Sequence, residues 1–166
     1  DDPRLRNPRV LLRRRKPELC GDFVSMNLVI ADDIAAVPAS GYLMTHVTNP
    51  FLSAATIRRA LAAYQAGVAD GSADSLFTVT RHQTRFYRGD GSAINHDPAH
   101  LIRTQDLEPW YEENSCMYLF SAASFAATQA RIGARPILFP IPKHEAVDID
   151  DEDDWKVAAL LAAGLE

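Results

Sequence analysis

The sequence predicts an α/β fold with a mainly parallel sheet. Along the chain, the spacing of apolar residues changes repeatedly between two, which is typical of strands, and 3.6, which is typical of helices. The strand-like segments are short and apolar throughout, as in sheets that are covered on both faces. The length of 166 residues and the 47% of apolar residues suit a single domain, spanning residues 1–166, with its own core.

Three elements are expected in the first third of the chain. The apolar run Val10–Leu12 predicts a short buried strand. Asp22 is a good N-cap residue, and the apolar residues after it predict a helix that reaches Ile34. The apolar run at residues 42–47 predicts a strand, which the turn residues Thr-Asn-Pro at 48–50 bring to an end.

The clearest helix follows Ser53, a residue type that caps helices well. Apolar side chains recur at i, i+3, i+4 and i+7 from Ile57 to Tyr64, and Gly67 predicts the end of the helix. A further apolar run then predicts a strand at residues 74–80.

Residues 84–109 interrupt this alternation and predict an insertion or arm that projects from the sheet. Strand-like segments at 84–88 and 92–95 flank Gly89-Asp90-Gly91, which is a hairpin signal because glycine accepts positive φ. The alternation then resumes and predicts strands at 115–120 and 137–141 and helices at 124–131 and 151–163.

The charges are unevenly distributed between the two ends of the chain. The net charge is −5, yet residues 1–16 are basic and residues 145–166 are acidic. An acidic protein without a basic face and interleaved aromatic residues is not expected to bind a nucleic acid polymer. A basic end and an acidic end suit a polyanionic ligand together with its metal ion.

Cys20 and Cys116 stand far apart and lack the spacing of metal ligands, so both are expected to be reduced thiols. No apolar run reaches the roughly 18–20 residues of a membrane span. No signal-peptide pattern opens the chain. Together these features predict a cytoplasmic protein without membrane association.

The strongest local motif is Asp148-Ile149-Asp150. In an extended segment, residues i and i+2 point the same way, so Asp148 and Asp150 are expected on one side, opposite Val147 and Ile149. Carboxylates are ligands that Mg²⁺ prefers, and such a site suits substrate phosphates. The alternative is that these acids stabilise the N-terminus of the last helix through its dipole, which fits residues 151–154 better.

Other polar segments have both a functional and a structural interpretation. The basic run Arg13–Lys16 either binds phosphates or is a solvated strand end. His46 ends a strand, where it either faces a ligand or is satisfied within the core. The polar residues at 103–107 and 111–115 suit a polyhydroxy or carboxylate ligand, with Arg103 as a bidentate partner, or form an ordinary loop. The sequence contains neither G-x-G-x-x-G nor G-x-x-x-x-G-K-[ST], the glycine-rich phosphate loops.

Several short motifs follow one another along nearly the whole chain. They are Asp1-Asp2, Arg15–Leu19 with Asp22, Thr48–Leu52, Arg103–Leu107, Asn114-Ser115 and Asp148–Asp150. In this order, they resemble the motifs S-T-D-D, R-P-x-E-L…D, T-S-P-L or T-N-P-L, R-R-Q-D-L, N-G and D-I-D of the acylneuraminate cytidylyltransferases, the CMP-sialic acid synthetase family.

The resemblance implies a three-layer, Rossmann-like nucleotidyltransferase fold. It implies a Mg²⁺-dependent enzyme that transfers CMP from CTP to the anomeric hydroxyl of a nonulosonic acid and releases pyrophosphate. Asp148 and Asp150 would bind the metal, and Arg15 would lie near the nucleotide. The residues implied at the sugar acid are His46, Asn49, Arg103, Gln105 and Asn114. Residues 84–109 correspond to the family's dimerisation arm, which implies a homodimer.

The chain also departs from the family. Thr104 stands in place of the second Arg of R-R-Q-D-L, Ser115 in place of Gly, and His46 in place of a sugar-contacting Gln. The family's first strand and its loop of the type A-R-G-G-S-K-G have no counterpart, so Asp1-Asp2 is expected to end a second strand of an N-terminally incomplete domain. Two alternatives stay open: the same chemistry on 3-deoxy-manno-octulosonate, and a non-catalytic remnant that binds a sugar acid or a partner subunit.

Overall fold

The computed structural model describes residues 6–164, so the Asp1-Asp2 motif lies outside the described residues. The chain divides into two compact units, with the boundary between Ala39 and Ser40. Among residues 6–164, no helix combines the length and the apolar character needed to cross a membrane.

The first unit contains a 3₁₀ helix, η2 (Pro17–Leu19), and helix α1 (Met26–Ala36). Helix α1 begins later than predicted, because its cap is Ser25 and not Asp22. The Ser25 hydroxyl accepts a hydrogen bond from the Asn27 amide, at 3.3 Å. Residues 21–24 form a turn before this cap, closed by a backbone hydrogen bond of 3.2 Å.

The predicted strand at Val10–Leu12 is not formed. Its two leucines are exposed, and no strand of the described chain pairs with it. The basic run that follows is attached to α1 by ion pairs: Arg13 binds Asp32 and Asp33, and Lys16 binds Asp32. These contacts favour the structural interpretation for Arg13 and Lys16.

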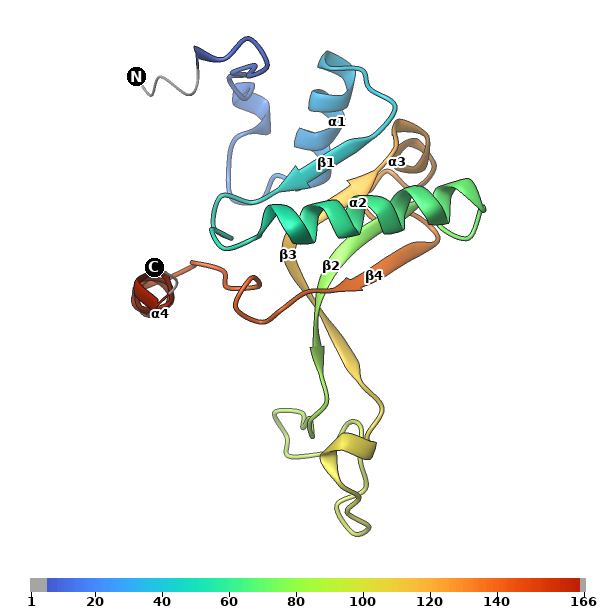
Figure 1. Ribbon diagram of the computed structural model, residues 1–166, viewed down its shortest axis with the longest axis vertical. Helices are drawn as coiled ribbons and strands as arrows, with labels where there is room; N and C mark the ends of the chain where they lie inside the picture. The colour runs from blue at the N-terminus through green and yellow to red at the C-terminus, as the bar shows by residue number, and fades with distance from the viewer. Residues whose placement is uncertain (1–5, 165–166) are drawn as a thin grey trace. The chain divides into compact units, whose positions relative to one another are not determined.

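The second unit combines helices with a four-stranded sheet (Figure 1). Its elements are β1 (Tyr42–Thr45), α2 (Ala54–Ala69), β2 (Ser75–His82), the 3₁₀ helix η3 (Thr104–Asp106), β3 (Trp110–Phe120), α3 (Ala122–Thr128), β4 (Pro136–Pro140) and α4 (Glu152–Gly164). The helix predicted after Ser53 is confirmed with its cap, since the Ser53 hydroxyl accepts a hydrogen bond from the Thr56 amide. It continues past Gly67 to Ala69.

The strands lie in the order β1-β3-β2-β4. Strand β3 is antiparallel to β1 and to β2, and β4 is parallel to β2. The α/β content is confirmed, but the mainly parallel sheet is not, because only one of these neighbouring pairs is parallel. The cause is β3: the arm returns the chain beside β2, so β3 runs opposite to its two neighbours. Strands β1, β2 and β4 all point in one direction.

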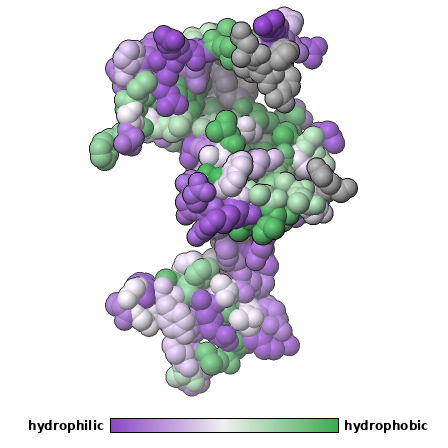
Figure 2. Space-filling view, turned by 90° about the vertical axis from the view of Figure 1, so that its left-hand side faces the viewer, coloured by the Kyte–Doolittle hydropathy of each residue, from purple (hydrophilic) through white to green (hydrophobic). Residues whose placement is uncertain are grey.

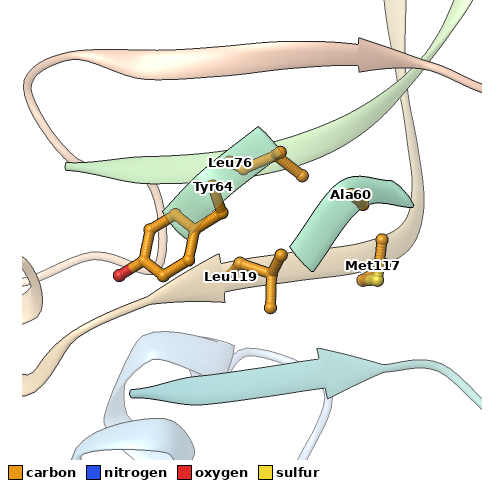
Figure 3. Close-up of a cluster of buried hydrophobic side chains, with 5 residues drawn as sticks. All are labelled: Ala60, Tyr64, Leu76, Met117 and Leu119. Carbon is orange, nitrogen blue, oxygen red and sulfur yellow. The ribbon is translucent and has the colours of Figure 1, made fainter. Parts of the chain in front are cut away.

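The core of the second unit lies between α2 and one face of the sheet. Its buried cluster consists of Ala60, Tyr64, Leu76, Met117 and Leu119 (Figure 3). Because successive residues of a strand point to opposite faces, Tyr118 lies on the face away from α2. There its ring stacks on Phe77, with 6.4 Å between the ring centroids.

Strand β3 carries a bulge where it passes Thr78 of β2. In the β2–β3 ladder, this one residue faces the segment Asn114–Met117. The Thr78 hydroxyl binds the backbone of Met117 both as donor (3.3 Å) and as acceptor (3.0 Å). Ser115 has a φ of 58°, in the left-handed region that favours glycine. This is the position at which the resembled family has Gly.

The predicted arm extends away from the sheet as a continuation of β2 and β3 (Figure 1). The last pair of its ribbon is His82 with Trp110. At its tip the predicted turn is present, because the Arg88 amide donates to the Ser92 carbonyl at 2.8 Å and Gly91 has a φ of 83°. The flanking segments 84–88 and 92–95 do not form strands and are joined by a single bridge, between Tyr87 and Ala93. On the face seen in Figure 2, hydrophilic residues cover the narrow stem between the sheet and the tip.

Candidate functional site

The segment after β4 is tied to the N-terminus of α2 by a buried carboxylate. Glu145 is 7% exposed. Its Oε2 accepts a hydrogen bond from the Ser53 amide, and its Oε1 accepts one each from the hydroxyls of Ser53 and Thr56, all at 3.0 Å. The Cys116 thiol of β3 lies 3.7 Å from the backbone carbonyl of Glu145 and 3.4 Å from that of Asn114, so its single hydrogen is shared between the two. Glu145 therefore joins this segment to both α2 and β3.

Beyond Glu145, the same segment binds the turn that follows β1. The Asn49 side-chain amide donates to the Val147 carbonyl at 3.2 Å, and the Ile149 amide donates to the Thr48 carbonyl at 3.0 Å. The segment is not a strand, so the expected extended geometry is not established. Asp148 between these contacts is half-buried, whereas the Asp150 side chain is exposed.

Two buried polar atoms near this turn, His46 Nε2 and Asn49 Oδ1, have no hydrogen-bond partner among residues 6–164. Asn49 is 6% exposed. Buried polar groups are nearly always hydrogen-bonded, and an unsatisfied one costs about 1–3 kcal/mol. The end of β1 is therefore suited to a ligand that brings polar groups of its own.

The charge state of His46 follows from its surroundings. Burial lowers the pKa of His46 below 6.5, and the nearby Arg131 guanidinium lowers it further. The carboxylates of Asp148 and Glu113 act in the opposite direction without reversing this shift. His46 is therefore a neutral imidazole at neutral pH, with acidic and basic groups within electrostatic range.

Two residues that the sequence analysis missed, Arg131 and Tyr118, lie near His46 together with Glu113 of the polar segment 111–115. The Arg131 guanidinium lies 3.9 Å from the centre of the Tyr118 ring and 3.3 Å from the Glu113 carboxylate. The Tyr118 hydroxyl donates its single hydrogen to Glu113, and its oxygen lies 3.3 Å from the Ser115 hydroxyl. The rings of Tyr118 and His46 are 6.3 Å apart. No sequence spacing links these residues, because Arg131 follows α3 and the others belong to β1 and β3.

Asp148 and Asp150 fit a magnesium ion by the chemistry of their donors, which are hard carboxylate oxygens. Among residues 6–164, the ion pairs involve acids other than Asp148 and Asp150. In the same residues, no group of three or more His, Cys, Asp or Glu side chains is arranged to hold a metal. A cation bound by these two aspartates would therefore take its other oxygen ligands from a substrate or from water.

The other residues predicted at the sugar acid do not all lie near His46, Asn49 and Asp148. Asn114 is buried in the β3 bulge, where its side-chain amide donates to the Thr80 hydroxyl at 3.2 Å. Arg103 lies on the arm and forms a bidentate pair with Asp106, at 2.7 Å and 3.0 Å. Gln105 also lies on the arm and is exposed. The structure thus gathers His46, Asn49 and Asp148, while Arg103 and Gln105 remain on the arm.

Arg15 and one groove complete the description of the candidate residues. Arg15 is exposed and belongs to the first unit, whereas the other predicted site residues belong to the second. A groove of about 490 Å³ opens between α2 and β1 and is lined mainly by apolar side chains such as Leu43 and Leu61. None of the predicted site residues lines this groove.

Comparison with known proteins does not assign the chain to a family. A scan of the chain against models of protein families gives no match, and a search of curated proteins gives none either.

The two thiols are expected to differ in reactivity. Cys116 is buried, and burial together with the nearby Asp148 carboxylate raises its pKa to about 12, so it forms little thiolate at pH 8. Cys20 is exposed. Ellman's reagent at pH 8 should therefore label Cys20 in the native protein and Cys116 only after urea is added. Fast labelling of Cys116 without urea would contradict its burial in β3.

Glu145 is expected to make stability depend on pH. Burial alone would raise the pKa of Glu145, but hydrogen bonds from Ser53 and Thr56, and the nearby His144, hold it below 4.5. Because the folded pKa is the lower one, this stabilisation is complete above about pH 4.5 and is lost as the pH falls through the folded pKa. Urea midpoints measured from pH 7 to pH 3 should fall more steeply for the wild type than for Glu145→Gln. Parallel curves for the two proteins would contradict this expectation.

Proposed function

We propose that this chain is a nucleotidyltransferase that transfers CMP from CTP to the anomeric hydroxyl of an acylneuraminate-type nonulosonic acid and releases pyrophosphate, with Mg²⁺. One observation carries the proposal. Two motifs of the resembled family, Thr48–Leu52 and Asp148–Asp150, are joined by the hydrogen bonds from Asn49 to Val147 and from Ile149 to Thr48. The first of these bonds spans 98 residues of sequence. A sugar-side motif and a metal-side motif therefore share one place in the second unit.

The chemistry of the cluster suits a sugar acid. The unsatisfied Asn49 Oδ1 can accept a hydrogen bond from a sugar hydroxyl, and the neutral His46 ring offers a nitrogen beside it. The Arg131 guanidinium supplies positive charge within range of His46, which suits a ligand that carries a carboxylate.

In this proposal, Asp148 and Asp150 hold the metal. Magnesium supplies charge neutralisation for the triphosphate and an anchor for the attacking hydroxyl. The anomeric oxygen forms a bond to the α-phosphorus, the bond from the α-phosphorus to pyrophosphate breaks, and the hydroxyl proton passes to solvent. The protein contributes mainly position. The Ile149 N–H is shared between the Thr48 carbonyl, at 3.0 Å, and the Asp148 carboxylate, at 3.1 Å, and so restrains Asp148.

We place the sheet within a three-layer, Rossmann-like nucleotidyltransferase fold, in which β1, β2 and β4 are the parallel strands and β3 is the reversed one. The shared direction of β1, β2 and β4 supports this assignment. The arm is proposed to form a homodimer, since Tyr87, Leu101 and Ile102 leave large apolar surfaces exposed on it. The free thiols of Cys20 and Cys116 support a cytoplasmic location.

A pyrophosphate-release assay tests the proposal. The chain is incubated with CTP, Mg²⁺ and either an acylneuraminate, 3-deoxy-manno-octulosonate or no acceptor. We expect pyrophosphate release in the arm with the acylneuraminate and in neither of the other two arms. Release only in the arm with 3-deoxy-manno-octulosonate would favour that sugar acid as the acceptor. The assay is repeated with the chain fused to a loop of the A-R-G-G-S-K-G type. No release in any arm would overturn the enzymatic function and favour a binding protein.

A further inference from the structure

Glu145 stands between two parts of the second unit that the proposed reaction needs together. Before it, the chain is fixed to the sheet, because the Ile141 amide donates to the Val79 carbonyl at 3.1 Å. After it, the next fixed points are the contacts of residues 147 and 149 with the turn after β1. Between these two anchors, the Glu145 carboxylate makes three hydrogen bonds to the start of α2.

We propose that Glu145 is a positioning residue, whose buried carboxylate clamps residues 145–149 so that Asp148 is held beside His46 and Asn49. The clamp itself follows from the contacts, and only its effect on turnover rests on the proposed function. Because Glu145 has no contact that would place it at the reacting atoms, it acts through the position of Asp148.

The chemistry of the clamp requires a carboxylate of this length. Both oxygens act as acceptors, facing one backbone N–H and two hydroxyls. Glutamine has one acceptor oxygen and an NH₂ donor, so at least one of these groups in Glu145→Gln would meet a donor instead of an acceptor. Aspartate is shorter by one carbon–carbon bond, about 1.5 Å, which is enough to break a hydrogen bond of 3.0 Å.

The clamp also couples the loop to a rigid element. Helix α2 spans Ala54–Ala69 and packs Ala60 and Tyr64 into the core. The Ser53 amide precedes the first turn of this helix, where backbone N–H groups lack partners within the helix and a negative charge is favourable. Glu145 therefore fastens a loop to a helix that packs into the core.

Amide hydrogen exchange of the 166-residue chain tests the clamp directly. In Glu145→Gln, protection of the Ile149 amide is expected to fall by about 10-fold or more, while that of the Ile141 amide, on the sheet side of the clamp, is unchanged. Glu152→Gln, an exposed charge change at the start of α4, should alter neither amide. Unchanged protection of Ile149, or an equal loss at both amides, would overturn the proposal. If Glu145→Gln does not fold, Thr56→Val removes one of the three bonds and should lower Ile149 protection by a smaller factor.

A kinetic comparison separates positioning from general stability. Glu145→Gln is expected to raise the Mg²⁺ concentration needed for half-maximal pyrophosphate release by about 10-fold, since Asp148 is no longer held in place. Ala60→Gly, which weakens α2 inside the core without touching the clamp, should leave that concentration unchanged. Equal effects of the two variants would mean that Glu145 is merely structural. If the wild type releases no pyrophosphate, the proposed function fails, while the exchange result still decides the clamp.

Discussion

Replacing Asp148 with asparagine is expected to reduce pyrophosphate release on the order of 100-fold or more, and Asp150→Asn should do the same. The amide has nearly the same shape as the carboxylate but lacks its charge, so metal binding is lost. The amide oxygen can still accept the hydrogen bond that the Ile149 amide now gives to Asp148. Initial rates at saturating CTP, together with thermal midpoints of each variant, measure the effect.

The matched control is Asp153→Asn. This exposed residue lies on α4, where its carboxylate pairs with Lys156 at 2.6 Å. Its substitution changes the net charge by the same amount close to the motif, and an exposed pair of this kind contributes about 1 kcal/mol at most. The rate of this variant should equal that of the wild type. Unchanged rates in both Asp148→Asn and Asp150→Asn would remove the metal site from the mechanism.

The largest effect on stability is expected for Leu76→Ala, a loss of about 2–5 kcal/mol in the free energy of unfolding. Leu76 of β2 is fully buried and belongs to the cluster that joins α2 to the sheet (Figure 3). Truncation removes apolar contacts and leaves a cavity that the neighbouring strands cannot close. Urea unfolding followed by circular dichroism gives the difference.

Leu43→Ala serves as the comparison for the core. Leu43 lies on β1 of the same sheet, opposite Leu119, and is 44% exposed. Its truncation gives up less buried area and should cost less than about 1.5 kcal/mol. Similar losses in the two variants would show that the core is not centred between α2 and the sheet.

Local signals predicted individual elements well and the pairing of strands poorly. The start of the helix after Ser53 was predictable because its cap and its apolar spacing lie within one segment, whereas the end predicted at Gly67 was wrong, since the helix continues to Ala69. The direction of β3 was not, because apolar periodicity is the same for a strand that runs either way. Val10–Leu12 shows the same limit: an apolar run becomes a strand only where another strand is beside it.

Some residues of the candidate site were also predictable from the sequence, and others were not. Asp148 and Asn49 were identified from motifs, and the structure supplies the contact that joins their segments. Glu145 has no sequence signal of its own, since its partners Ser53 and Thr56 lie about 90 residues earlier, as the separations of 92 and 89 show. Arg131 could not be predicted either, because its neighbour Tyr118 belongs to another element and a cation–π contact leaves no spacing pattern in the sequence.

The ribbon formed by β2 and β3 makes the arm a separable module. Its outermost pair, His82 and Trp110, closes the ladder before the irregular tip begins. An insertion or deletion beyond this pair changes the length of the tip without shifting any partner in the sheet, because the antiparallel pairing nearer the core stays in phase. Among related chains, differences in length should therefore be concentrated between His82 and Trp110. A two-residue Asn-Gly turn could replace the tip.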